Sequence, residues 1–88
     1  MFRWNHEKNR LLISERGISF EEITQAIFDG HAVNDSPHKN KEKYPNQRIL
    51  TVMINNYAYL VPYVIDGNDL FLKTIIPNRQ ATKEYREE

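Results

Sequence analysis

The segment Ser19–Glu22 constrains the fold of this chain more than any other. Its sequence, S-F-E-E, matches a capping box, in which the Ser19 hydroxyl and the Glu22 carboxylate each accept a hydrogen bond from the other residue's backbone amide. Gly30 can then adopt the left-handed conformation that ends many helices. Between these two signals the apolar residues recur at helical spacing, at Phe20, Ile23 and Ile27. The sequence therefore predicts a helix between Ser19 and Gly30 that buries one side.

A second helix is predicted just before this one. Asn5 is a residue type suited to capping a helix, the stretch from His6 to Arg16 is polar or charged except for three apolar residues, and Gly17 can provide a left-handed C-cap. Ahead of Asn5, the alternation in Phe2-Arg3-Trp4 predicts a short strand. We expect this strand to lead into two antiparallel helices that join at Gly17.

The hydrophobic period changes from helical to alternating in the second half of the chain. Asn55-Asn56 and the segment 66–69 have the composition of tight turns, and Asn78 can cap a last helix. The sequence predicts three strands and a terminal helix, at Arg48–Ile54, Tyr57–Ile65, Leu70–Ile76 and Arg79–Glu88. Pro62 cannot donate to a ladder, so its strand lies at an edge there or is bulged. The polar run Asn34–Asn46 is predicted to be a long loop.

These elements predict an α+β fold of two layers, in which an antiparallel sheet of three or four strands packs with the helices in a single domain of residues 1–88. A chain of 88 residues has room for one hydrophobic core. Without cysteine it can form no disulfide, and its apolar runs are far shorter than the roughly 20 residues of a membrane-spanning helix. We expect a protein of the reducing cytoplasm with no membrane segment.

Charge is balanced overall but unevenly distributed. Lys and Arg together number 12, as do Asp and Glu, so net charge cannot attract nucleic acid. Residues 17–35 hold four carboxylates and no Lys or Arg, whereas residues 37–48 hold four cations and one carboxylate. In the last helix Arg79, Lys83 and Arg86 fall on one face. If that face lies beside the segment 38–48, the two form a basic cleft.

The familiar motifs of metal-dependent and acyl-enzyme hydrolases are missing. There is no H-E-x-x-H, no nucleophile elbow around a serine, and no phosphate-binding G-x-x-x-x-G-K-[ST]. His31, Asp35 and His38 could meet at a metal, but short clusters of this kind usually arise by coincidence, so we predict neither a metal nor a cofactor. The remaining Arg, Lys, His, Tyr and carboxylate side chains suit metal-independent cleavage of RNA by its own 2′-hydroxyl.

Three segments carry a family resemblance. They read F-x-W-N-x-x-K-N at residues 2–9, R-G-I-S-F-E-E at residues 16–22 and L-K-T-I-I-P-N-R-Q-A-T-K-E-Y at residues 72–85. Together they resemble the BrnT family, the toxin halves of bacterial type II toxin–antitoxin pairs. The resemblance implies a fold like that of the RelE and ParE toxins, ribonuclease activity that arrests translation, and neutralisation by a cognate antitoxin with a ribbon-helix-helix part. The chain would then contact DNA only through that antitoxin.

The candidate site residues are cations and aromatic side chains. Arg79 matches the family's C-terminal arginine, and a guanidinium near a helix N-terminus can hold two oxygens of the scissile phosphate. Histidine can shuttle a proton near neutral pH, and tyrosine can stack on a base. The predicted catalytic residues are Arg79, Arg48, His38 and Lys43. The predicted substrate-binding residues are Lys73, Lys83 and Tyr85. We expect Arg48, Lys73 and Arg79 to converge on one pocket sized for a phosphodiester.

Two other functions fit the same sequence. A non-catalytic interaction module could use the acidic helix pair and the hydrophobic strands to bind a protein partner. A toxin directed against DNA gyrase could use the same scaffold, since one fold can host several functions.

Overall fold

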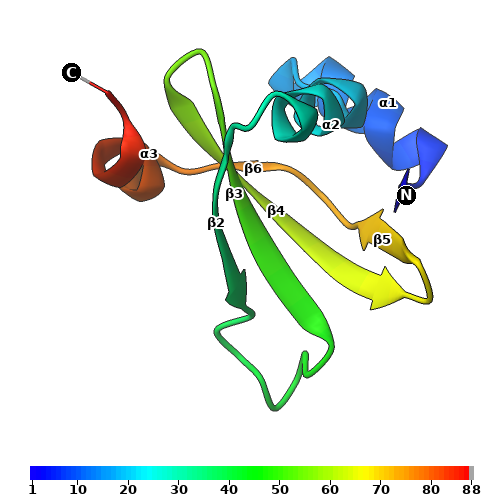
Figure 1. Ribbon diagram of the computed structural model, residues 1–88. Helices are drawn as coiled ribbons and strands as arrows, with labels where there is room; N and C mark the ends of the chain where they lie inside the picture. The colour runs from blue at the N-terminus through cyan, green and yellow to red at the C-terminus, as the bar shows by residue number, and fades with distance from the viewer. Residues whose placement is uncertain (88) are drawn as a thin grey trace.

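The computed structural model describes residues 1–87, which form three helices and six strands. In chain order these are β1 (Phe2–Arg3), α1 (His6–Arg16), α2 (Phe20–Phe28), β2 (Ala32–Pro37), β3 (Gln47–Ile54), β4 (Tyr57–Asp66), β5 (Asp69–Leu72), β6 (Ile76–Pro77) and α3 (Arg79–Tyr85) (Figure 1). The predicted α+β fold is confirmed, because a short N-terminal strand, two helices, a sheet and a C-terminal helix follow one another as expected.

Both predicted helix starts are confirmed by their capping contacts. The Asn5 side chain accepts a hydrogen bond from the Lys8 amide at 2.9 Å. At α2, the Ser19 hydroxyl accepts a hydrogen bond from the Glu22 amide, and the Glu22 carboxylate accepts one from the Ser19 amide, both at 3.1 Å. Gly17 ends α1 with a φ of 67°, a left-handed conformation that residues with a Cβ rarely adopt. Local capping thus defines the two-helix unit.

The sheet is larger than the sequence predicts. Its strand order is β1-β5-β4-β3-β2, with β6 also paired to β4. Within residues 1–87, β1 runs parallel to β5 and the other pairs are antiparallel. The predicted turn at Asn55 and Asn56 is confirmed, since both residues have positive φ, at 51° and 62°. The strand β2 occupies part of the predicted loop, because its largely exposed and polar side chains hide the alternation that marks a strand.

Pro62 lies in an internal strand at a gap in the ladder. On one side of β4, the β5 pairing extends from Asp66 to Tyr63 and the β6 pairing begins at Leu60. The Pro62 carbonyl points toward this side and accepts a hydrogen bond from the Lys73 amide at 2.8 Å. The missing N–H of the proline therefore falls between β5 and β6, where the ladder is interrupted and no donor is required.

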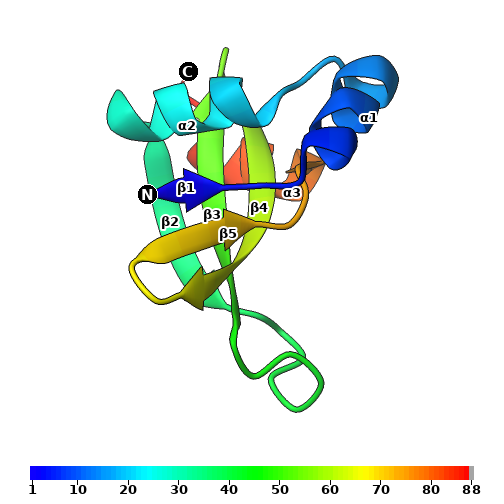
Figure 2. The same ribbon diagram turned by 90° about the vertical axis from the view of Figure 1, so that its right-hand side faces the viewer.

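The helices lie on both faces of the sheet. Figure 2 shows α2 across one face with α1 beside it, and α3 behind the sheet. The hydrophobic core fills the α2 side and comprises Leu12, Ile18, Phe20, Ile23, Ala26, Val52, Val61, Tyr63, Leu72 and Ile75. On the α3 side, the Thr82 hydroxyl accepts a hydrogen bond from the Ala58 amide at 2.8 Å. The chain has a radius of gyration of 12.6 Å, as expected for a compact fold of this length.

The terminal helix begins as predicted and is shorter than predicted. The Asn78 side chain caps α3 by accepting a hydrogen bond from the Ala81 amide at 2.7 Å. The helix ends at Tyr85, and Arg86 is an extended capping residue. Glu88, where the predicted helix ends, lies outside the described residues. None of the helices within residues 1–87 has the length and apolar character needed to cross a membrane.

Candidate functional site

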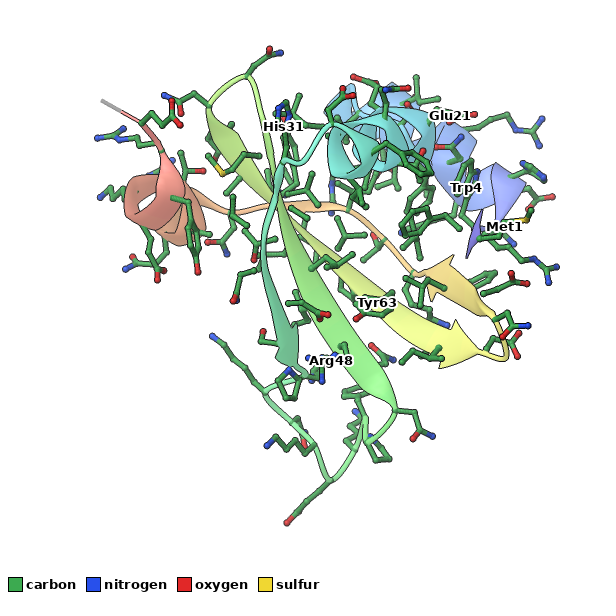
Figure 3. The ribbon with its side chains drawn as sticks, in the orientation of Figure 1. Met1, Trp4, Glu21, His31, Arg48 and Tyr63 are labelled. Atoms are coloured by element: carbon green, nitrogen blue, oxygen red, sulfur yellow. The ribbon has the colours of Figure 1, made fainter. Side chains whose placement is uncertain are left out.

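Arg48 belongs to a three-residue network on the α2 side of the sheet (Figure 3). Its Nε donates a hydrogen bond to Asp35 Oδ1 at 3.2 Å, and the Tyr63 hydroxyl lies 2.9 Å from both oxygens of the same carboxylate. Burial raises the pKa of the Tyr63 hydroxyl above its ordinary value, and the hydrogen bond to Asp35 raises that pKa further. One carboxylate on β2 thus links side chains from β3 and β4.

Arg48 therefore faces away from α3. Side chains alternate along β4, so Tyr63 and Ala58 lie on opposite faces of the sheet, with Tyr63 in the core beneath α2. The segment around Ala58 contacts α3, which begins with Arg79. Arg48 and Arg79 are thus separated by the sheet. The structure does not bring them together in the single phosphate pocket that the sequence suggests.

His38 and Lys43 pack against a common ring in the loop between β2 and β3. The His38 ring centroid lies 4.5 Å from that of Tyr44, and the Lys43 Nζ lies 5.4 Å from the Tyr44 centroid. His38 Nδ1 accepts a hydrogen bond from the Asn40 amide at 3.1 Å. The loop is therefore ordered by its own contacts, and only His38 Nε2 remains for exchanging a proton with another molecule.

The other predicted cations are exposed at separate positions. Lys73 follows β5, and its Nζ lies 5.6 Å from the Phe71 ring centroid. Arg79 and Lys83 share one side of α3, which the helical repeat separates from the side of Gln80. The salt bridges found among residues 1–87 involve none of these three cations.

A cavity of about 290 Å³ lies between α3 and the strands β2, β3 and β4. We call it the α3 cavity. It brings together a lysine from the β2–β3 loop, a carboxylate and a phenol, at Lys39, Glu84 and Tyr85. Side-chain amides and hydroxyls also line it, at Asn34, Ser36, Asn78 and Gln80. The α3 cavity is therefore polar and carries groups of both charges.

A second cavity of about 280 Å³ adjoins the α3 cavity near the tip of the β3–β4 hairpin. We call it the hairpin cavity. Tyr85 lines both cavities, and the hairpin cavity adds His31 and Glu87. Figure 3 places His31 between α2 and the start of β2. The two neighbouring cavities share Tyr85 and together are lined by a histidine, two carboxylates and a lysine, a set of groups suited to moving protons and binding an anion.

Sequence reasoning found Tyr85 and missed the rest of this group. The sequence suggests His31 only as a metal ligand and gives no role to Glu84. The position of Glu84, four residues after Gln80 on the same side of α3, was a usable signal. The role of Lys39 was not predictable, because β2 was read as loop and its direction toward α3 was unknown.

No group of three His, Asp or Glu side chains in the part of the chain that the structure describes is placed to hold a metal ion. Asp35 is bound to Arg48 and Tyr63, and His38 packs on Tyr44, so these two do not assemble with His31. Comparison of the chain with protein-family models, curated proteins and solved structures finds no match.

Proposed function

We propose that the chain is a metal-independent ribonuclease toxin of the BrnT type, with the α3 and hairpin cavities as its active site. One observation supports this site above others. Tyr85 joins two cavities that together hold His31, Glu84, Glu87 and Lys39. Tyr85 also closes the terminal segment that resembles the BrnT family. The toxin would act in the cytoplasm and be neutralised by a cognate antitoxin.

The reaction is an attack of the RNA 2′-hydroxyl on the neighbouring phosphate, which forms a 2′,3′-cyclic phosphate and releases the 5′-oxygen. It requires a base for the hydroxyl proton, a cation for the phosphorane and an acid for the leaving oxygen. His31 and Glu84 are the proposed proton carriers, and Lys39 the proposed phosphate ligand. The Tyr85 ring would stack on a base, since every base offers an aromatic face.

The exposed cations outside the cavities would contact the rest of the RNA strand. Arg79 and Lys83 lie on the same helix as Tyr85, and Lys73 directly follows β5, where its amide donates a hydrogen bond to the Pro62 carbonyl of β4. Phosphate contacts of this kind position a nucleic acid and make its binding sensitive to salt. Arg79 and Lys83 are therefore proposed to hold flanking phosphates.

The test is RNA cleavage by the purified chain in the presence of a metal chelator. We expect His31→Gln and Glu84→Gln each to slow cleavage by about 10²-fold or more, the usual contribution of a general acid or base. Both side chains are exposed, so the fold should be retained, which circular dichroism checks. The matched control is Glu15→Gln, an exposed change on α1 that should leave cleavage unchanged.

Expression of the chain alone should also arrest growth and degrade messenger RNA. Intact RNA beside normal growth would contradict the ribonuclease function. Intact RNA beside altered DNA supercoiling and a DNA-damage response would instead support a toxin directed against gyrase.

A protein-interaction module is the second candidate function, and exposed apolar side chains favour it. Phe28 is 78% exposed at the end of α2, where its ring lies edge-on to that of Phe2 at 6.1 Å, and Ile65 is 61% exposed. Large exposed apolar groups mark protein contacts when they gather in a patch. A neighbouring gene for a ribbon-helix-helix antitoxin would favour the toxin, and its absence together with intact RNA would favour the module.

A further inference from the structure

A third hollow shares His31 and Asn55 with the hairpin cavity. It has a volume of about 430 Å³ and runs between α2 and the tip of the β3–β4 hairpin. We call it the α2 groove. Its apolar part is formed by the buried Ala26 and the half-buried Ile54. Its rim carries three carboxylates, at Glu21, Glu22 and Asp29.

The rim carboxylates are bound by neutral groups in the part of the chain that the structure describes. Each accepts a hydrogen bond from a neutral donor: Glu21 from Asn9 at 2.6 Å, Glu22 from Ser19 at 3.1 Å and Asp29 from Gln25 at 3.1 Å. None of the three takes part in a salt bridge within residues 1–87. The segments 17–38 and 49–72, which build the groove, contain no Lys or Arg. The groove therefore places three carboxylates around an apolar floor, and no Lys or Arg of the described residues lines it.

We propose that the α2 groove docks a basic amphipathic segment of a partner protein. An apolar side chain of that segment would enter the groove over Ala26 and Ile54, and flanking Lys or Arg side chains would meet the carboxylates. When an amphipathic segment binds in a groove, the apolar contact provides most of the affinity. Complementary charge increases the specificity and the association rate. The proposal does not rest on the proposed ribonuclease activity, although His31 and Asn55 line both this groove and the hairpin cavity.

The partner is a different protein rather than a second copy of this chain. The segment of the chain richest in lysine is the β2–β3 loop, which carries Lys39, Lys41 and Lys43. Its aromatic side chain, Tyr44, is already packed between His38 and Lys43. The loop therefore offers charge without a free apolar side chain to fill the groove.

The probe is a synthetic peptide of about 14 residues with Leu and Lys at helical spacing, compared with a peptide in which Glu replaces Lys. Amide NMR shifts of the full chain should move at Ala26, Ile54 and Asn55 on addition of the Lys peptide, and should not move with the Glu peptide. Gln25→Lys adds a positive charge to the exposed rim and should weaken binding of the Lys peptide about tenfold at low salt. Ser14→Lys adds the same charge at an exposed position of α1 and is the matched control.

Four results would overturn the assignment. Shifts spread over other surfaces would show that the peptide binds by charge alone, and equal weakening by Gln25→Lys and Ser14→Lys would show the same. Absence of binding would remove the groove as a docking site. Concentration-dependent association of the chain in sedimentation, abolished by Gln25→Lys, would make a second copy the occupant.

Discussion

Asn9 is a buried polar residue that ties α1 to α2. It is 5% exposed, its Nδ2 donates a hydrogen bond to Glu21 Oε1 at 2.6 Å, and its Oδ1 accepts one from the Phe20 amide at 2.8 Å. Truncation leaves that buried amide without a partner, which costs roughly 1–3 kcal/mol. We expect Asn9→Ala to lower the free energy of unfolding by about 2 kcal/mol in urea titrations. Asn46→Ala, at an exposed position, is the control and should change it little.

The same contact predicts a signature in pH. The hydrogen bond from Asn9 holds the pKa of Glu21 below its ordinary value of 4.5. A carboxylate with a lowered pKa contributes its full stability above the unfolded-state value, and this contribution is lost as the pH falls through the folded-state value. In Asn9→Ala the pKa of Glu21 should therefore rise toward its ordinary value, which NMR titration of the variant measures. An unchanged pKa in that variant would contradict the contact.

Among the strands, β2 depends on contacts made across the sheet. Its side chains are mostly exposed, and Asp35 is bound to Arg48 of β3 and Tyr63 of β4. We expect Tyr63→Phe to lower the free energy of unfolding by about 1–2 kcal/mol and to speed amide hydrogen exchange in β2. RNA cleavage should change little, because Tyr63 lies on the face away from the α3 cavity.

The control for this change is Tyr57→Phe. The Tyr57 side chain is exposed, and its hydroxyl makes no hydrogen bond within the described part of the chain, so the variant should match the parent protein in stability. If Tyr63→Phe lost most of its RNA cleavage while its stability was unchanged, the network of Arg48, Asp35 and Tyr63 would have to be part of the active site.

Local elements were predictable from sequence, and the site was not. The capping box at Ser19 and the Asn55-Asn56 turn depend on a few neighbouring residues, so the sequence alone defines them. The alternation also predicted that Arg48 shares a face with Leu50 and Val52, but that α2 rather than α3 covers this face was not predictable, because the other face carries Ile49 and Met53. The hollow around Tyr85 depends on strand register and on α3 docking, which no local pattern encodes.

In the whole molecule, the helices on the two faces of the sheet are held by different means. On the α2 side a continuous hydrophobic cluster includes Trp4, whose ring stacks on Phe20 with centroids 5.6 Å apart. The buried residues of α3 are only Ala81 and Thr82, and hydrogen bonds at Ala58 and Asn78 complete its attachment. Hydrophobic stabilisation scales with the apolar area buried, so α3 is the more weakly held layer.

We therefore expect α3 to open at a lower free energy than the core, and the proposed active site to open with it. Amide hydrogen exchange across residues 79–85 should be less protected than in α2. In rising urea, RNA cleavage should fall before the fluorescence of Trp4, the one tryptophan of the chain, reports loss of the core. Thr82→Val removes the hydroxyl that accepts a hydrogen bond from the Ala58 amide. The variant should lose amide protection in α3, and the urea midpoint of the Trp4 fluorescence change should shift little. Equal protection of α3 and α2 would mean that both layers unfold as one unit, and cleavage and fluorescence would then be lost together.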